Sequence, residues 1–180
     1  DYPVRVTSAG GRYHFQDDWE TPDTQVITMD FDNNTSITWE GRSCNGLRVE
    51  GSSVGVIFYG EKGAVYIDGG NSYKVYDQKN KLIRNVENDI TVDARNAMDP
   101  SRQLDGYHIQ NFFDGIRKGS AQAADILGGH KSTLLVQLGN IAQRSGRTLN
   151  IDSKNGHIVN DREAEKFWSR EYEKGWEPKV

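Results

Sequence analysis

The sequence predicts an α+β fold in which a large, mostly antiparallel sheet carries helices packed on one face. Two observations predict it. The first half of the chain holds short strand-like runs separated by turn residues, and the second half spaces its apolar residues as helices do. Runs of strands followed by runs of helices are typical of the α+β class. With 180 residues, the chain suits a single domain over residues 1–180 that can bury a core.

Successive strands in the first half are joined by short turns, which favours an antiparallel meander. The clearest strand places Ile27, Met29 and Phe31 on one face. It ends at the turn 32–34, whose Asp and Asn residues predict a hairpin. The predicted strands cover residues 4–8, 25–31, 35–39, 47–49, 54–59, 64–68 and 73–76.

The strands at 54–59 and 64–67 are apolar on both of their faces. A sheet with one face in water should alternate apolar and polar residues, so both faces here require cover. We expect the helices to cover one face, and a second subunit or another part of the protein to cover the other. The alternative is that tyrosines and small apolar residues are tolerated on a face in water.

Residues 78–104 are polar and without a clear period, which predicts a long loop from the sheet to the helices. Asp105 can then cap a first helix that ends at Gly119. One face of this helix is expected to be buried, because its apolar residues recur at i, i+3, i+4 and i+7. These residues are Ile109, Phe112, Phe113 and Ile116.

Two further helices and a short strand follow. The second helix ends at Gly146, and residues 148–151 return as a strand. Asp161 can cap a third helix. The second helix carries the apolar residues Leu134, Leu135, Leu138, Ile141 and Ala142, and the third has Ala164, Phe167 and Trp168 on one side.

Composition and motifs exclude several classes of function. The net charge of −4 gives no electrostatic reason to expect nucleic acid or an anionic membrane as partner, and no apolar run is long enough to span a membrane. Cys44 is the only cysteine, so no disulfide forms within the chain. No glycine-rich phosphate loop and no metal-ligand spacing occur. The residues therefore assign no catalytic, cofactor-binding or metal-binding role.

Two places carry polar residues suited to binding a sugar or polyol. The segment 39–46 supplies Trp39, Arg42 and Asn45, an aromatic ring with charged and amide groups that can hydrogen-bond hydroxyls. The alternative is an ordinary polar connection between strands. The second place is Tyr107 and His108, in the first turn of the first expected helix, where a neutral histidine is favoured. The alternative there is a packed or capping histidine.

Several motifs, taken in order, resemble the Gfo/Idh/MocA oxidoreductases, the family of glucose–fructose oxidoreductase and inositol dehydrogenase. The run Gly60-Glu61-Lys62-Gly63 to Asp68 is similar to a hairpin motif of this family, and residues 108–117 are similar to its "HxxNFxDxIR" helix. Residues 138–147, Asp161 to Ala164 and the closing Trp176 continue the resemblance, which covers nearly the whole chain.

The resemblance implies an enzyme with two domains. An amino-terminal Rossmann domain binds NAD or NADP, and the carboxy-terminal domain shapes the pocket for a sugar or polyol and forms the subunit interface. The chain opens on Asp1-Tyr2-Pro3 and resembles only the second part. We therefore expect the Rossmann domain and the catalytic residues to lie outside the chain, and the chain alone to be inactive and to bind no cofactor.

The resemblance also adds Arg48, Glu50 and Ser52 as candidate substrate contacts, and it supports Tyr107 and His108. It implies a homo-oligomer formed through the open sheet face. Two other functions stay open: a stand-alone carbohydrate-binding or adaptor module, and part of an NAD-dependent glycosidase of the same family. We expect a cytoplasmic protein, with the bacterial periplasm as the alternative, since many relatives with a similar tail are exported.

Overall fold

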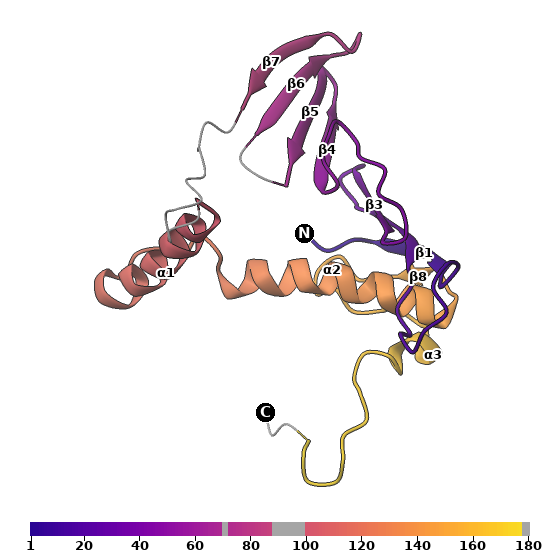
Figure 1. Cartoon of the computed structure of the whole chain (residues 1–180). Helices are drawn as coiled ribbons and strands as arrows, with labels where there is room; N and C mark the ends of the chain where they lie inside the picture. The colour runs from indigo at the N-terminus through magenta and orange to yellow at the C-terminus, as the bar shows by residue number, and fades with distance from the viewer. Residues whose placement is uncertain (70–71, 88–99, 178–180) are drawn as a thin grey trace. The chain divides into compact units, whose positions relative to one another are not determined.

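The computed structural model describes residues 1–69, 72–87 and 100–177, and side chains are described outside residues 100–105. The predicted α+β class is confirmed (Figure 1). The chain forms two compact units, of which one comprises residues 1–45 and 124–180 and the other residues 46–123.

The first unit contains a four-stranded antiparallel sheet in the order β3-β2-β1-β8. The expected hairpin at 32–34 joins β2 to β3, and Asn34 adopts the left-handed backbone (φ 61°) that such a turn favours. Ile27 and Met29 are buried, as predicted. The strands are β1 (Arg5–Gly11), β2 (Thr24–Asp30), β3 (Ser36–Arg42) and β8 (Leu149–Asn150).

Helix α2 (Ile126–Ser145) packs on this sheet and closes the core of the first unit (Figure 1). Val6 of β1, Leu138 of α2 and Leu149 of β8 are fully buried, because the apolar side chains of these three elements pack together in the core. The predicted end of α2 at Gly146 is confirmed by its left-handed backbone (φ 63°).

The carboxy-terminal helix α3 (Arg162–Glu165) is one turn long. As predicted, Asp161 caps it by accepting a hydrogen bond from the backbone N–H of Ala164. Ala164 is fully buried, whereas Phe167 and Trp168 remain about two-fifths exposed at 43% and 40%.

The second unit contains a four-stranded antiparallel meander in the order β4-β5-β6-β7. The strand β7 (Leu82–Val86) lies inside the region predicted as a loop, so that prediction was wrong. Asp77 turns the chain into β7 by accepting the backbone N–H groups of Lys79 and Lys81, and a bulge after Val75 disturbs the alternation that would have revealed the strand. The other strands are β4 (Gly55–Gly60), β5 (Gly63–Asp68) and β6 (Tyr73–Asp77).

Helix α1 (Pro100–Lys118) begins earlier than predicted, so Asp105 lies within it and is not its cap. Proline is favoured at a first helical position because its missing N–H has no partner there in any case. The predicted burial of the apolar stripe was also wrong for this chain. Helical spacing identifies an apolar face but not what covers it. The four stripe residues, Ile109, Phe112, Phe113 and Ile116, are between 41% and 67% exposed.

The eight strands in the described part of the chain thus divide between two antiparallel sheets, where the sequence led us to expect one large sheet. The division falls between β3 and β4, where the described backbone of residues 43–54 forms turns and one isolated bridge, Val49 to Ser52. Helix packing on a sheet face is seen for α2. No described helix is long and apolar enough to cross a membrane.

Two glycines of α2 should respond oppositely to alanine. At Gly139 a Cβ would lie 2.4 Å from the Cδ1 of Ile27, whereas at Gly129 it would meet nothing within 4 Å. We expect Gly139→Ala to lower the free energy of unfolding by about 1–3 kcal/mol through overpacking. Gly129→Ala should raise it by about 0.5–1 kcal/mol through helix propensity. Denaturant unfolding of both variants checks this, and equal effects would contradict the close contact.

Candidate functional site

Asp23 holds the loop between β1 and β2 in the first unit. Its side chain is buried, with 2% of the residue exposed. One carboxylate oxygen accepts the backbone N–H groups of His14 (2.9 Å) and Phe15 (3.0 Å). The other accepts the N–H of Tyr13 (3.2 Å) and the hydroxyl of Thr24 (2.9 Å). One carboxylate thus fixes three successive residues of the loop.

These donors lower the pKa of Asp23 far below its usual range. The N–H of Phe15 contributes most, and together with the N–H of His14 and the remaining donors it outweighs burial, which acts in the opposite direction. The carboxylate is therefore ionised at every physiological pH, and the loop conformation depends on that charge.

Arg12 fastens the other side of the same loop. Its guanidinium donates to the carbonyl oxygen of Thr21 (2.9 Å) and pairs with Asp17. Its Nε is buried, and it has no hydrogen-bond partner among the residues that the structure describes. The loop is thus closed on itself at both ends by charged side chains.

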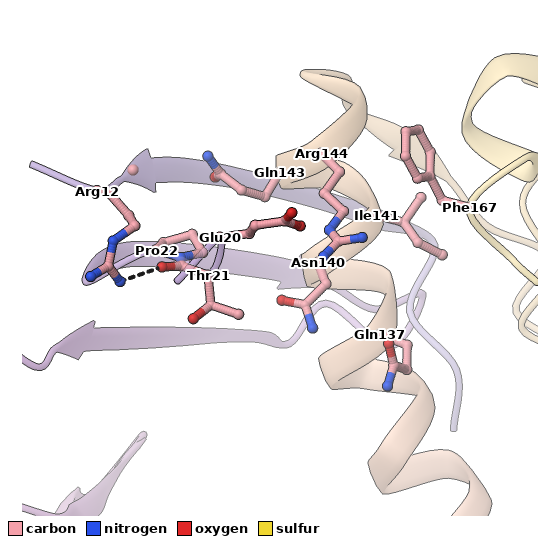
Figure 2. A pocket seen from close by; sticks show the side chains of 11 residues that line it. Arg12, Glu20, Thr21, Pro22, Gln137, Asn140, Ile141, Gln143, Arg144 and Phe167 are labelled. Carbon is pink, nitrogen blue, oxygen red and sulfur yellow. Dashed lines mark hydrogen bonds between the residues drawn. The ribbon is translucent and has the colours of Figure 1, made fainter. Parts of the chain in front are cut away.

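A cavity of about 400 Å³ lies between this loop and the carboxy-terminal half of α2 (Figure 2). Asn140 and Arg144 project from α2 on the side that faces Glu20 and Thr21 (Figure 2). The remaining side chains of the lining are Arg12, Pro22, Gln137, Ile141, Gln143 and Phe167.

One wall of this cavity is fixed by Gln143. Its amide donates to the carbonyl oxygen of Gly10 (2.7 Å) and accepts from the hydroxyl of Ser8 (3.0 Å). The side chain therefore joins α2 to β1. Since the loop is also held by Asp23 and Arg12, the cavity is formed without a ligand.

A second polar cluster lies on the sheet of the second unit. Glu50 has a left-handed backbone (φ 52°), uncommon for a residue other than glycine, which places its carboxylate against β6. One carboxylate oxygen accepts from the ammonium of Lys74 and from the hydroxyl of Tyr76, both at 2.9 Å. The neighbouring Val49 accepts the hydroxyl of Tyr66 at 3.1 Å. The segment carrying Glu50 is thus tied to β5 and β6.

The three groups of this cluster shift one another's pKa. The Lys74 ammonium, followed by the Tyr76 hydroxyl, holds the pKa of Glu50 below its usual value. Glu50 in turn raises the pKa of Lys74. Burial first, and then the Glu50 carboxylate, raise the pKa of Tyr76. Glu50 is therefore ionised and Lys74 charged at neutral pH, with 40% and 32% of their side chains exposed.

The predicted site residues belong to three segments of the chain, divided between the two units. In the first unit, Trp39 is half exposed on β3, and Arg42 at the end of this strand pairs with Glu40 at 3.0 Å. Asn45 follows in the turn, where its N–H donates to the carbonyl oxygen of Arg42 at 3.3 Å. Trp39 thus lies in the middle of β3, Arg42 at its end and Asn45 in the turn that follows.

The other predicted residues belong to the second unit. Arg48, Glu50 and Ser52 lie in one tight turn, in which Ser52 forms hydrogen bonds in both directions with the backbone of Val49. Tyr107 and His108 lie in α1, and both are exposed; because α1 begins at Pro100, the prediction that they lie in its first turn was wrong. The structure thus brings the three turn residues together. Their role in binding, like that of the other five, stays a prediction.

Sequence reasoning missed the partners of Glu50 and the polar face of α2. Lys74 and Tyr76 alternate with Val75 along β6, so the alternation did place them on one face. One face of α2 is polar, with Gln137, Asn140 and Arg144 at helical spacing. The prediction for this helix used only the apolar residues between them. The hydrogen bonds by which Asp23 holds residues 13–15, here called the Asp23 clamp, could not be predicted from the sequence, because an aspartate just before a strand is a common feature.

Metal and thiol chemistry gain no support here. Among residues 1–69, 72–87 and 100–177 no group of three or more His, Cys, Asp or Glu side chains is arranged to hold a metal ion. Cys44 is partly buried, and its sulfur lies 3.6 Å from the hydroxyl of Thr24. It is a structural contact of the strand end.

Comparison with known proteins gives consistent findings. The model of a family described as "Oxidoreductase family, C-terminal alpha/beta domain" matches residues 23–178. No curated protein matches the chain. Among solved structures, the chain is similar to an oxidoreductase from Agrobacterium radiobacter in complex with NAD+, L-tartaric acid and magnesium. The TM-score is 0.61 and the identity 14%, over 83% of this chain and 43% of that one.

Two other solved structures, both described as oxidoreductases, share the fold. The Thermotoga maritima protein gives a TM-score of 0.55 at 15% identity, over 83% of this chain and 41% of that one. The yvaA protein of Bacillus subtilis gives 0.54 at 12% identity, over 84% and 46%. At these identities the likeness shows the fold alone. The chain spans less than half the length of each of these proteins.

Because of the Asp23 clamp, the thermal stability of the protein should decrease at acidic pH. Because the pKa of Asp23 is lowered on folding, its contribution is complete above the unfolded value of 3.8 and is lost as pH falls through the folded value. We expect Asp23→Asn to lower the melting temperature at pH 7, and this difference to shrink below about pH 4. Thermal melts of both proteins from pH 7 to pH 2 measure it.

Asp18→Asn is the matched control, because Asp18 is an exposed carboxylate of the same loop. It should leave the melting temperature nearly unchanged at every pH. A constant difference between the native protein and Asp23→Asn across the whole range would contradict the clamp.

Proposed function

The chain belongs to the Gfo/Idh/MocA family of oxidoreductases, and on that premise we propose that it is the carboxy-terminal domain of an NAD- or NADP-dependent dehydrogenase acting on a sugar or polyol. Residues 1–180 act together as the part that shapes the substrate pocket and forms the subunit interface. The observation that carries this proposal is the family match over residues 23–178, most of the chain. The similar Agrobacterium radiobacter structure, in complex with NAD+, supports the choice of cofactor.

The turn with Arg48, Glu50 and Ser52 supplies the substrate contacts that the geometry supports best. The Glu50 carboxylate is held by Lys74 and Tyr76, so it needs little ordering when a ligand binds. Being ionised, it accepts hydrogen bonds from hydroxyl groups, while Arg48 can donate to them. An acceptor and a donor in the same turn suit the vicinal hydroxyls of a sugar. Trp39, Arg42, Asn45, Tyr107 and His108 are proposed as further contacts.

The dinucleotide itself does not fit the residues that the structure describes. A pyrophosphate site of the Rossmann kind needs a glycine-rich turn between a parallel strand and the amino terminus of a helix. All strand pairs described are antiparallel, and the carboxylate of Asp125 caps the amino terminus of α2. We therefore assign cofactor binding and the catalytic residues to an amino-terminal Rossmann domain of the same protein.

One face of the sheet in the second unit has the character of a subunit interface. Cross-strand pairing puts Val56 beside Ile67 and Phe58 beside Val65, which in turn lies beside Val75. Val56 and Phe58 are 44% and 57% exposed, which is unfavourable for large apolar side chains in water. Two described charged side chains lie on this face: Arg84 lies over the ring of Tyr73 at 5.4 Å, and Asp77, at the end of β6, accepts the backbone N–H groups of Lys79 and Lys81. We propose that a second copy of the chain covers this face.

The enzymatic test uses the full-length protein. It should reduce NAD+ or NADP+ with a neutral sugar or polyol, followed by the absorbance of the reduced cofactor. Glu50→Gln should raise KM roughly ten-fold with little change in kcat, because a hydrogen bond to a charged group is lost equally from the bound substrate and the transition state. Glu61→Gln, an exposed carboxylate of the β4–β5 turn, is the control and should leave KM unchanged.

The chain of residues 1–180 alone should give no binding signal with either cofactor in titration calorimetry. Micromolar binding would contradict the assignment of the cofactor to another domain. Absence of any dehydrogenase activity in the full-length protein over a broad panel of sugars and polyols would overturn the proposed function.

The interface is tested by two adjacent residues on opposite faces of β4. Phe58→Arg should convert an oligomer to a monomer in sedimentation at micromolar concentration, because it buries an unpaired charge. Tyr59→Arg changes the other face, where Tyr59 is 83% exposed, and should leave the oligomer intact. A native chain that sediments only as a monomer would contradict the interface.

A further inference from the structure

Four polar side chains of the α2 cavity have no partner. Glu20, Gln137, Asn140 and Arg144 line it, and none of them forms a side-chain hydrogen bond or ion pair with the described part of the chain. Three of the four lie on one face of α2 at a spacing of three and four residues. Polar groups gathered in one concave place and left unpaired are what a polar ligand would use.

The walls that carry these groups are rigid. Arg12 is held by Asp17 and by the carbonyl of Thr21, and Gln143 joins α2 to β1. The buried carboxylate of Asp23 fixes the start of the loop. A ligand entering the cavity therefore has to order only the free side chains, which keeps the entropic cost of binding small.

The charges of the lining indicate what kind of ligand fits. Arg12 is paired with Asp17, which lies outside the lining, so the charged groups of the lining without an ion-pair partner are Glu20 and Arg144, of opposite sign. An anion would meet the Glu20 carboxylate, and a cation would meet Arg144. A hydroxyl both donates and accepts, so a row of hydroxyls can satisfy a guanidinium, a carboxylate and two amides at once.

Apolar surface completes the lining. Phe167, Pro22 and Ile141 stand beside the polar groups, and Phe167 is 43% exposed. An aromatic ring next to hydrogen-bonding groups matches the two kinds of surface on a sugar ring, whose C–H groups are apolar and whose edge carries hydroxyls. The volume of about 400 Å³ lies within the range of small-molecule sites.

We propose that this cavity is a binding site for a neutral polyhydroxylated small molecule, of the size of a monosaccharide or cyclic polyol. Arg144 donates to the ligand, Glu20 accepts from it, and Asn140 does both, while the ring of Phe167 covers an apolar side. The site lies entirely within the first unit. It goes beyond the function proposed above and does not depend on hydride transfer, so each can fail without the other.

The test uses the 180-residue chain labelled with ¹⁵N, titrated with D-glucose, with myo-inositol and with the anion D-gluconate. A neutral probe should shift backbone amide signals of the cavity, among them those of Asn140 and Arg144, and leave the signals of β4 to β7 unchanged. Arg144→Ala should weaken its binding about ten-fold, since a charged donor is lost. Gln137→Ala serves as the second variant if Arg144→Ala does not fold.

Arg162→Ala is the matched control, because Arg162 is exposed on α3 and lies outside the lining. It should leave the dissociation constant unchanged. The proposal is overturned if neither neutral probe shifts the cavity signals, or if Arg162→Ala weakens binding as much as the cavity variants do. It is also overturned if gluconate binds ten-fold more tightly than both neutral probes and Glu20→Gln strengthens gluconate further, because the cavity would then be an anion site.

Discussion

The close packing of α2 against the first sheet is the constraint on which the rest of the first unit depends. Gly139 leaves no space for a side chain because Ile27 occupies it, so the helix backbone lies directly on the apolar face of β2. Leu138 is fully buried beside this contact. This contact sets the rotation of α2 about its axis. Gln137, Asn140 and Arg144, which are spaced three and four positions apart, therefore point toward the loop between β1 and β2.

Two carboxylates with lowered pKa values do different work in the two units. Asp23 is buried, and its carboxylate oxygens accept hydrogen bonds from backbone N–H groups. Its charge therefore stabilises the loop conformation. Glu50 is partly exposed, and one oxygen binds both Lys74 and Tyr76 while the other is available to a ligand. Depth of burial and the type of donor, rather than the shift itself, therefore separate the structural carboxylate Asp23 from Glu50, the carboxylate proposed to bind a ligand.

Much of the fold could be predicted because its signals are local. The hairpin at 32–34, the cap at Asp161 and the end of α2 at Gly146 each depend on one residue type with a fixed backbone preference. The strand β7 was missed because a bulge interrupts its alternation of apolar and polar residues. The apolar face of α1 was wrongly predicted to be buried, because the spacing of apolar residues does not show which part of the protein packs against them. In the candidate site, the strand predicted at 47–49 was wrong, because the chain turns there with only an isolated bridge from Val49 to Ser52, and the contact of Glu50 with β6 depends on a positive φ, which no pattern of residue types encodes.

The second unit is inserted into the first, since residues 46–123 interrupt a unit built from residues 1–45 and 124–180. In a chain made from its amino terminus, the meander β4 to β7 has all its partners as soon as it is complete, and it can fold through local contacts. The first sheet must instead wait for α2 and for Leu149, which pairs with Val6. Synthesis thus leaves the apolar face of β1 and β2 uncovered for the time needed to make the insert. In this interval the unfinished first sheet is open to misassembly, because its apolar face and the strand edge that β8 will cover are both exposed.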